Sequence, residues 1–290
     1  MFKNSNQFGH HIPSAKEIAS DELVWSCLVK ALSRSLVSIG ANVDSISEDI
    51  SVIHEAMLRL GEDQLALESF LQSHFHGYLA GPHIQSAIQS RANLVFEQVE
   101  KFLPSQGTVL DVGAGDGLIA AQISSQEREV ILCDVLDYRS PEAAKLQWHQ
   151  LLQGTSLPFD ADTFDCVTVL TVLHHANDPL HLLQEACRVC RGRILILESV
   201  VGVDVYDSEL DIDLGALTLE EQLKYAACVD WFYNRVLHVD VNTPFNFTTP
   251  AEWKSLLSEN GFSCIACTPL GIDQPLVAEN HCLIVAEPSR

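Results

Sequence analysis

Residues 109–117 read VLDVGAGDG, an apolar run that leads into three alternating glycines. Glycine has no side chain and adopts positive φ at little cost, so Gly113, Gly115 and Gly117 let a ligand approach the backbone closely. The next apolar run, EVILCDV, ends in Asp134. An acid at that place can accept hydrogen bonds from both hydroxyls of a ribose. Together, the turn and the acid indicate a nucleoside-containing ligand.

The spacing and charge of this turn distinguish between two kinds of nucleoside-containing ligand. Dinucleotide-binding turns carry G-x-G-x-x-G, whereas Leu118 stands here in the place of the third glycine. Asp111 and Asp116 flank the turn and would repel a pyrophosphate. They would attract a sulfonium cation that also carries an amino group. The electrostatics therefore favour S-adenosylmethionine (SAM) over NAD as the cofactor.

A histidine pair, His174 and His175, follows the apolar run FDCVTVL. Methyl transfer from a sulfonium requires a positioned nucleophile and an acceptor that loses its proton. Histidine, with an ordinary pKa of about 6.5, can take that proton. We expect one of the two rings to line the active site, as a general base in one interpretation. In the other, the pair only shapes the loop before a helix that begins at Pro179.

The pattern of apolar residues along the chain changes after Pro104. Up to about residue 103 the apolar residues recur at helical spacing, and we expect four helices there, over about 15–39, 47–61, 64–80 and 83–103. Beyond it, short apolar runs alternate with helical stretches, which predicts right-handed βαβ units around a parallel sheet. We predict an α/β fold: a doubly wound sheet of seven strands preceded by an N-terminal helical region. The expected strands are TVLDV, EVILCDV, a segment near Trp148, FDCVTVL, RILILES, FSCIACTPL and HCLIVAE.

This change in the sequence pattern predicts two domains. Residues 1–103 form the helical region, which we expect to cap the ligand site, and residues 104–290 form the ligand-binding domain. Within the second domain, residues from about 202 to 250 are irregular and rich in acids and aromatics, and we interpret them as an insertion. The two late strands suit an antiparallel hairpin at one edge of the sheet.

The VLDVGAGDG turn with Asp134 resembles motif I and the following acidic position of class I SAM-dependent methyltransferases. Residues 157–179, LPFDADTFDCVTVLTVLHHANDP, resemble the small-molecule branch of that family, and so do residues 247–262. The likeness covers residues 104–200 well and 247–290 moderately. It does not cover the first hundred residues or the insertion. A Rossmann-like methyltransferase sheet is what the resemblance implies.

The resemblance also implies roles for individual residues. Asp111 and the three glycines would hold the methionine end of SAM, and Asp134 its ribose. Gln153 stands where the family usually has an acid that reaches the adenine amino group, and a carboxamide oxygen can still accept from that amine. The remaining positions are Gly154 and Thr155 at the adenine edge, Leu170 and Thr171 toward the methionine portion, and Arg91 toward the methionine carboxylate. The alternative for Arg91 is a solvated arginine on a helix surface.

Acceptor selection is expected from the insertion. Its segment 230–247, DWFYNRVLHVDVNTPFNF, combines aromatic rings with a few polar groups, as small-molecule pockets do. The equal alternative is a lid whose aromatic residues are core. Glu198, at the end of RILILES, points to the ligand end of the sheet. The candidate substrate residues are Trp231, Tyr233, Asn234, Arg235 and His238.

Other chemistry-bearing residues carry weaker signals. CRVC at 187–190 and CIAC at 264–267 have zinc-like spacing, but their positions suit small buried hydrophobic residues better. The histidines of HFHGYLAGPH at 74–83 lack the shared helix face and the acids that a metal site needs. We therefore expect no metal.

Composition limits the partners. The chain has 290 residues, a formal net charge of −22 and a pI near 4.7, which argues against a nucleic acid partner. The first residues lack the apolar core of a secretory signal, and no apolar run is long enough to cross a membrane. Nine cysteines without a small-scaffold pattern suit a reducing compartment. We expect a cytoplasmic protein without a membrane partner.

These observations favour an enzyme that transfers a methyl group from SAM to an oxygen or nitrogen of a small organic molecule. Two alternatives stay open. The acceptor could be a protein side chain, with the helical region as docking surface. Alternatively, the chain could be a non-catalytic SAM-binding module.

Overall fold

A computed structural model of the chain describes every residue except 1–5, 80–81, 153–155, 238–240, 275 and 290. The described chain divides into two compact units, each built from several segments. The first unit comprises residues 1–91, 199–249 and 271–281, and the second comprises 92–198, 250–270 and 282–290.

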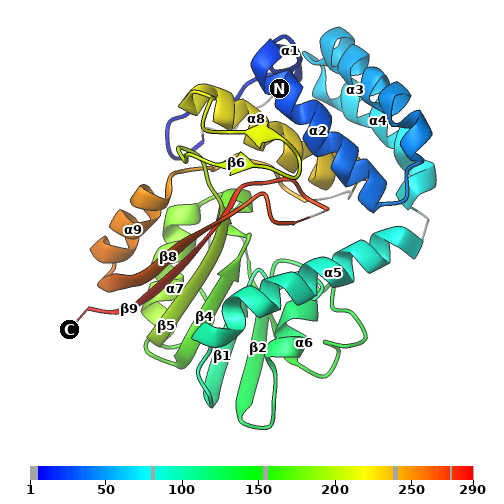
Figure 1. Cartoon of the computed structure of the whole chain (residues 1–290). Helices are drawn as coiled ribbons and strands as arrows, with labels where there is room; N and C mark the ends of the chain where they lie inside the picture. The colour runs from blue at the N-terminus through cyan, green and yellow to red at the C-terminus, as the bar shows by residue number, and fades with distance from the viewer. Residues whose placement is uncertain (1–5, 80–81, 153–155, 238–240, 275, 290) are drawn as a thin grey trace. The chain divides into compact units, whose positions relative to one another are not determined.

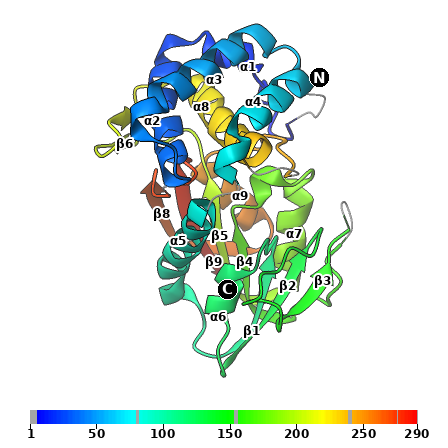
Figure 2. The same ribbon diagram turned by 90° about the vertical axis from the view of Figure 1, so that its right-hand side faces the viewer.

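The second unit is built on a seven-stranded sheet, as predicted. Its strand order is β3-β2-β1-β4-β5-β9-β8, and Figure 2 shows β3 at one edge and β8 at the other. The first five strands of that order pair in parallel. The strands are β1 (Gly107–Val112), β2 (Arg128–Asp134), β3 (Gln147–Gln150), β4 (Phe164–Leu170), β5 (Cys190–Ser199), β8 (Phe262–Gly271) and β9 (His281–Pro288).

The two late strands run antiparallel. Ser263 of β8 faces Ser289, with 2.8 Å between the hydroxyl oxygens, and Cys267 faces Cys282 of β9, with 3.6 Å between the sulfurs. Residues later in β8 therefore lie beside residues earlier in β9. This confirms the expected hairpin at one edge of the sheet.

Helices cover both faces of the sheet because its strands are apolar on both sides. Val95 and Val99, in the second half of α5 (Pro82–Val99), and inner residues of α6 (Leu118–Ile123) share one core with alternate residues of the strands. The helices α7 (Pro179–Val189) and α9 (Pro250–Glu259) contact each other behind the strands in Figure 1. The predicted helix over 83–103 ends earlier, at Val99, and a 3₁₀ turn, η2 (Glu100–Phe102), follows it.

The strand order reverses between β1 and β4, which lie side by side although β2 and β3 come between them in sequence. The chain leaves β1 for one side and β4 for the other, so the loops that follow these strands diverge. Ligands of open α/β sheets bind at such a reversal, beyond the carboxyl ends of the strands. The VLDVGAGDG turn follows β1 at this place.

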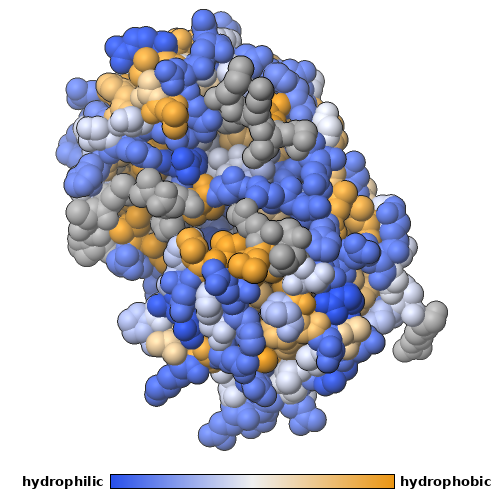
Figure 3. Space-filling model, turned by 180° about the vertical axis from the view of Figure 1, so that it is seen from behind, coloured by the Kyte–Doolittle hydropathy of each residue, from blue (hydrophilic) through white to orange (hydrophobic). Residues whose placement is uncertain are grey.

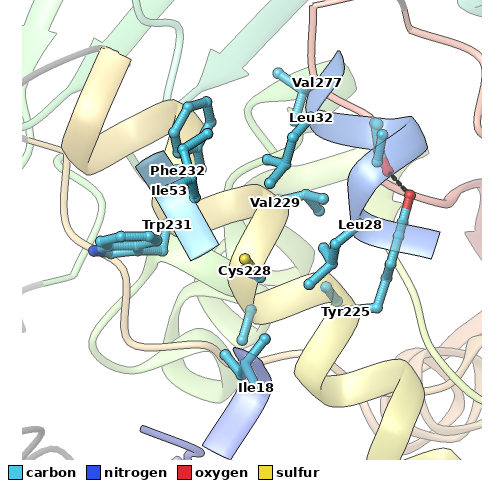
Figure 4. Packing of buried hydrophobic residues seen from close by; sticks show 14 of the residues in the cluster. Ile18, Leu28, Leu32, Ile53, Tyr225, Cys228, Val229, Trp231, Phe232 and Val277 are labelled. Carbon is cyan, nitrogen blue, oxygen red and sulfur yellow. Dashed lines mark hydrogen bonds between the residues drawn. The ribbon is translucent and has the colours of Figure 1, made fainter. Parts of the chain in front are cut away.

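The first unit is mostly helical. Its helices are packed around a single apolar core, part of which is drawn in Figure 4, where the Tyr225 hydroxyl donates a 2.7 Å hydrogen bond to the Ala278 carbonyl. It contains α1 (Ala15–Ala19), α2 (Glu22–Ser38), η1 (Val43–Ser45), α3 (Ile46–Leu60), α4 (Gln64–Leu79), α8 (Leu219–Trp231), the π-helical turn η4 (Phe232–Leu237), and the short paired strands β6 (Tyr206–Asp207) and β7 (Ile212–Asp213).

The prediction of one helix over 15–39 is wrong. The chain forms two helices, and the break between them lies at Ser20 and Asp21. The Asp21 side chain accepts a hydrogen bond from the Val24 backbone N–H and so caps the start of α2. Aspartate competes for nearby backbone N–H groups in this way, which favours a helix start over a helix interior.

The prediction that 202–250 is irregular is also wrong in part. The 13-residue helix α8 lies within this stretch, and a capping box formed by Thr218 and Glu221 starts it. Most residues from Gln222 to Trp231 are buried, so α8 lacks the polar face that gives a surface helix its periodic pattern. The helix α8 packs against α2, which places this stretch in the same unit as the N-terminal helices. The boundary between the units therefore differs from the one expected at residue 103.

Hydrophilic side chains make up most of the face drawn in Figure 3, and apolar atoms appear there in smaller groups. Among the described residues, none of the helices combines the length and the apolar character that crossing a membrane requires.

Candidate functional site

The glycine turn between β1 and α6 is held against the neighbouring strand. The N–H of Gly113 donates a 2.7 Å hydrogen bond to the Cys133 carbonyl at the end of β2, and the N–H of Gly117 donates to the Ala114 carbonyl at 2.9 Å. Gly113, Gly115 and Gly117 all have positive φ, at 71°, 55° and 71°. The turn is thus fixed in a conformation that side-chain-bearing residues rarely adopt.

The three glycines have different structural roles. A Cβ atom on Gly113 would lie 2.5 Å from the Val172 side chain, and one on Gly117 would lie 2.6 Å from Ala143. A Cβ atom on Gly115 would meet nothing within 4 Å. Gly113 and Gly117 are therefore required by close packing inside the unit. Gly115 alone presents bare backbone to open space, where a ligand can approach.

Asp134 is tied to that same glycine. Its Oδ2 accepts the Gly115 N–H at 2.7 Å, and its Oδ1 accepts the Val135 N–H at 2.6 Å. The side chain is buried, and desolvation raises the pKa of this carboxyl above its ordinary value. Each carboxylate oxygen has a second lone pair. The carboxylate can thus hold Gly115 in place and still accept from two hydroxyls.

Asp111 is a second buried acid beside the turn. Its Oδ1 accepts a 2.6 Å hydrogen bond from the Thr168 hydroxyl. Burial is the main reason why the pKa of the Asp111 carboxyl is raised to about 7; the Thr168 hydrogen bond limits this shift, and the nearby Asp134 and Asp116 carboxylates contribute to it. Repulsion among acids at this place is relieved by a cation and aggravated by a phosphate. The residues therefore fit a cationic nucleoside such as SAM.

The sequence reasoning missed Thr168. It lies in the middle of β4 directly across from Asp111, in register. A hydroxyl inside the apolar run FDCVTVL was the available signal. Only the parallel pairing of β1 and β4 shows that this hydroxyl donates to Asp111.

The backbone at the end of β4 is strained. Thr171 has φ of 59°, a left-handed conformation that a β-branched residue rarely adopts. Its N–H donates to the Leu197 carbonyl at 2.6 Å, and its hydroxyl donates to the Leu170 carbonyl at 2.7 Å. Such strain is concentrated at functional sites. Leu170 and Thr171 lie at the carboxyl end of the strand beside β1, and their role toward the methionine portion stays a prediction.

His174 lies in the 3₁₀ turn η3 (Leu173–His175) and is buried. Its Nδ1 is 2.5 Å from Oε2 of Glu198, an acid with no exposed surface at the end of β5. The neighbouring ring of His175 is partly exposed, and its centroid lies 4.0 Å from that of His174. The helix that follows starts with Pro179 at its first turn and Asp178 as its N-cap. The predicted helix start is confirmed, and the loop-shaping and catalytic roles of His174 and His175 stay predictions.

The predicted substrate residues lie in the first unit. Trp231 donates through its indole N–H to Glu68 at 3.0 Å, and Arg235 forms an ion pair with the same carboxylate at 3.1 Å. Asn234 donates to the buried Asp230 carboxylate at 2.6 Å. These contacts give Trp231, Asn234 and Arg235 partners within their own unit. Their roles toward a substrate stay predictions.

Tyr233 is partly buried against the core of the first unit. Arg91, predicted to pair with the methionine carboxylate, also belongs to this unit and donates from Nε to the Gln274 side-chain oxygen at 2.7 Å. Its role toward the methionine carboxylate stays a prediction. The predicted adenine-edge residues Gln153, Gly154 and Thr155 and the candidate substrate residue His238 lie outside the described residues.

A doubly wound sheet with a glycine turn and two buried acids at its switch point defines a nucleoside-binding α/β domain. Residues 110–197 match a family model described as "Methyltransferase domain". The chain therefore carries a class I SAM-dependent methyltransferase domain, which confirms the predicted family, sheet and cofactor.

Relatives and solved structures of similar proteins carry methyltransferase names. The chain is 26% identical over 167 residues to an uncharacterized methyltransferase, YcgJ, of Bacillus subtilis, covering 53% of this chain and 65% of that protein. It is 33% identical over 104 residues to the ubiquinone/menaquinone biosynthesis C-methyltransferase UbiE of Proteus mirabilis, covering 31% of this chain and 41% of that protein. It therefore spans less than two thirds of either relative.

A solved structure of the B. subtilis YcgJ protein also aligns with this chain. The identity is 18%, the TM-score is 0.46, and the alignment covers 69% of this chain and 98% of that one.

Proposed function

We propose that the protein transfers a methyl group from SAM to an oxygen or nitrogen of a small organic molecule. The observation that carries this proposal is the open backbone of Gly115 in a turn that is accompanied by two buried carboxyls, Asp111 at the end of β1 and Asp134 at the end of β2. A bare glycine lets a ligand reach the backbone, and the two acids select positive charge over phosphate.

SAM, when bound, supplies a methyl group on a positively charged sulfur, and the acceptor's lone pair displaces that sulfur as a neutral thioether. The protein then has three tasks. Asp134 would accept the ribose hydroxyls while it keeps Gly115 in place. Asp111 would lie near the positive charge of the methionine portion, which favours the ionised form of its buried carboxyl.

The third task is removal of a proton from the acceptor. His174 follows β4 at the carboxyl edge of the sheet, where the methionine portion is expected. An imidazole that already donates through Nδ1 has its second nitrogen as acceptor. We assign His174 as the general base, with His175 beside it as a wall of the same site.

A small-molecule acceptor is favoured over the alternatives by two observations. The net charge of −22 disfavours a nucleic acid substrate. A relative with one third identity over the matched segment is named for a step of quinone biosynthesis. That relative's name specifies a carbon acceptor, so a carbon nucleophile is an outcome that the test below must be able to report.

Two measurements test the proposal. Calorimetry should show SAM binding to the wild-type chain and no binding of NAD at millimolar concentration. Tritium from methyl-labelled SAM, added with the protein to a cell extract, should then appear in the small-molecule fraction after separation by size. Label in the protein fraction would instead support a side-chain acceptor, and SAM binding without any transfer would support a non-catalytic module. A chain that binds NAD and ignores SAM would overturn the proposal.

A further inference from the structure

Glu198 receives three hydrogen-bond donors from one loop. Its Oε1 accepts the backbone N–H groups of Val172 and Leu173, at 2.8 and 2.6 Å. Its Oε2 lies 2.5 Å from Nδ1 of His174. The side chains of Glu198 and His174 are 0% and 1% exposed, so water does not compete for these bonds. A buried carboxylate is tolerated when donors surround it in this way.

The arrangement determines which nitrogen of His174 carries the proton. A carboxylate accepts hydrogen bonds and cannot donate one, so Nδ1 must be the donor. In a neutral imidazole, Nε2 is then the acceptor nitrogen. The opposite tautomer would place a lone pair of Nδ1 against a lone pair of the Glu198 carboxylate.

We propose that Glu198 is a positioning residue that holds His174 in the Nδ1–H tautomer and presents Nε2 to the proton of the methyl acceptor. The inference rests on the proposed function. The proton leaves the acceptor's O–H or N–H bond, whose electrons stay on the acceptor atom, and it forms the Nε2–H bond of an imidazolium. The Glu198 carboxylate against Nδ1 stabilises that cation until the proton passes to solvent.

A purely structural role is the alternative, because Glu198 also holds the backbone of Val172 and Leu173. Glu198→Gln separates the two roles. Its amide oxygen can still accept both backbone N–H groups, but its N–H₂ group now faces His174. Nδ1 must then accept, and the proton moves to Nε2, where it blocks the base. The loop is retained while the tautomer is reversed.

The test combines nitrogen NMR of ¹⁵N-histidine-labelled protein with turnover. The His174 signal is assigned by its loss in His174→Gln. We expect the Nδ1–H tautomer in the wild type and the Nε2–H tautomer in Glu198→Gln. Turnover, measured as S-adenosylhomocysteine released from SAM with a panel of phenols, amines and carboxylic acids, should fall about 10- to 100-fold in Glu198→Gln. The KM for SAM should stay within about twofold.

Asp165→Asn is the matched control, because Asp165 also accepts a backbone N–H, from Thr108 at 2.9 Å, but does so at the amino-terminal end of the sheet. It should leave the His174 tautomer and turnover unchanged. A wild-type Nε2–H tautomer, or full turnover in Glu198→Gln, would overturn the role of Glu198. Absence of SAM binding by the wild type would instead overturn the proposed function, and calorimetry reports that separately from the tautomer.

Discussion

The Thr168 hydroxyl donates a 2.6 Å hydrogen bond to the Asp111 carboxylate, from one strand of the switch point to its neighbour. The pKa of this acid is raised to about 7, mainly by burial, and this bond is the described contribution that lowers it. The bond therefore keeps the carboxyl near the balance between its neutral and ionised forms at physiological pH. This balance makes the cofactor site sensitive to pH.

We predict that SAM affinity rises with pH and levels off above about pH 7. Below that pKa Asp111 is neutral and attracts a cation less, so affinity should fall by up to about tenfold per pH unit. Thr168→Val should move the midpoint to higher pH. Calorimetry at several pH values checks both, with the product S-adenosylhomocysteine, which lacks the sulfonium charge, as control. An equal pH dependence for the two ligands would contradict the role of the sulfonium charge.

In contrast to SAM affinity, the free energy of unfolding of the SAM-free protein should fall as the pH rises. The Asp111 pKa is about 7 in the folded protein and about 3.8 when unfolded, so the folded state holds the extra proton between these values. The contribution of Asp111 to stability is therefore lost as pH rises from about 4 to 7, and it is constant above. Urea denaturation of Asp111→Asn should show a weaker fall over this window than the wild type.

We predict that Gly115→Ala mainly weakens SAM binding, whereas Gly117→Ala mainly destabilises the fold. A methyl group on Gly115 meets open space, so the fold should lose only about 1 kcal/mol from the left-handed backbone, while SAM affinity falls at least about tenfold. A methyl group on Gly117 would lie 2.6 Å from Ala143, and this variant should lose about 2–4 kcal/mol. Urea denaturation and calorimetry separate the two. Similar destabilisation in both variants would refute the distinction.

Thr171→Gly should leave the free energy of unfolding within about 0.5 kcal/mol of the wild type. Glycine removes the strain of the 59° φ value, and this gain offsets its greater freedom in the unfolded chain. Turnover should fall nonetheless, because the end of β4 would no longer be held in one conformation. A loss of 2 kcal/mol or more in urea denaturation would show that the threonine conformation is unstrained.

The contact between Arg235 and Glu68 gives a test of the predicted substrate role of Arg235. Their ion pair is partly buried, so Arg235→Gln should destabilise the first unit by about 1–2 kcal/mol, as should Glu68→Gln, and the double variant should lose less than the sum. Thermal denaturation of the three variants measures this coupling. Additive losses, or an Arg235→Gln variant of wild-type stability, would favour a role for Arg235 outside the fold.

Much of the second unit was predictable, because its signals are local. The strands are short apolar runs between polar segments, and helices connect β1 to β2 and β4 to β5. The order of the glycines and the position of Asp134 after the next strand need no knowledge of distant contacts. In the first unit, by contrast, α8 is buried on most sides and carries no periodic stripe, so its sequence resembles an irregular segment.

The sequence by itself determined the doubly wound sheet, the glycine turn and the acids that suit a sulfonium nucleoside, since these follow from residue types at short spacing. Only the tertiary structure decided which glycine faces open space, which hydroxyl serves Asp111 and which acid holds His174. Those answers depend on neighbours brought together by strand pairing and packing, from positions 24 to 57 residues apart for the last two. Spacing along the chain cannot report which side chains meet across a folded sheet.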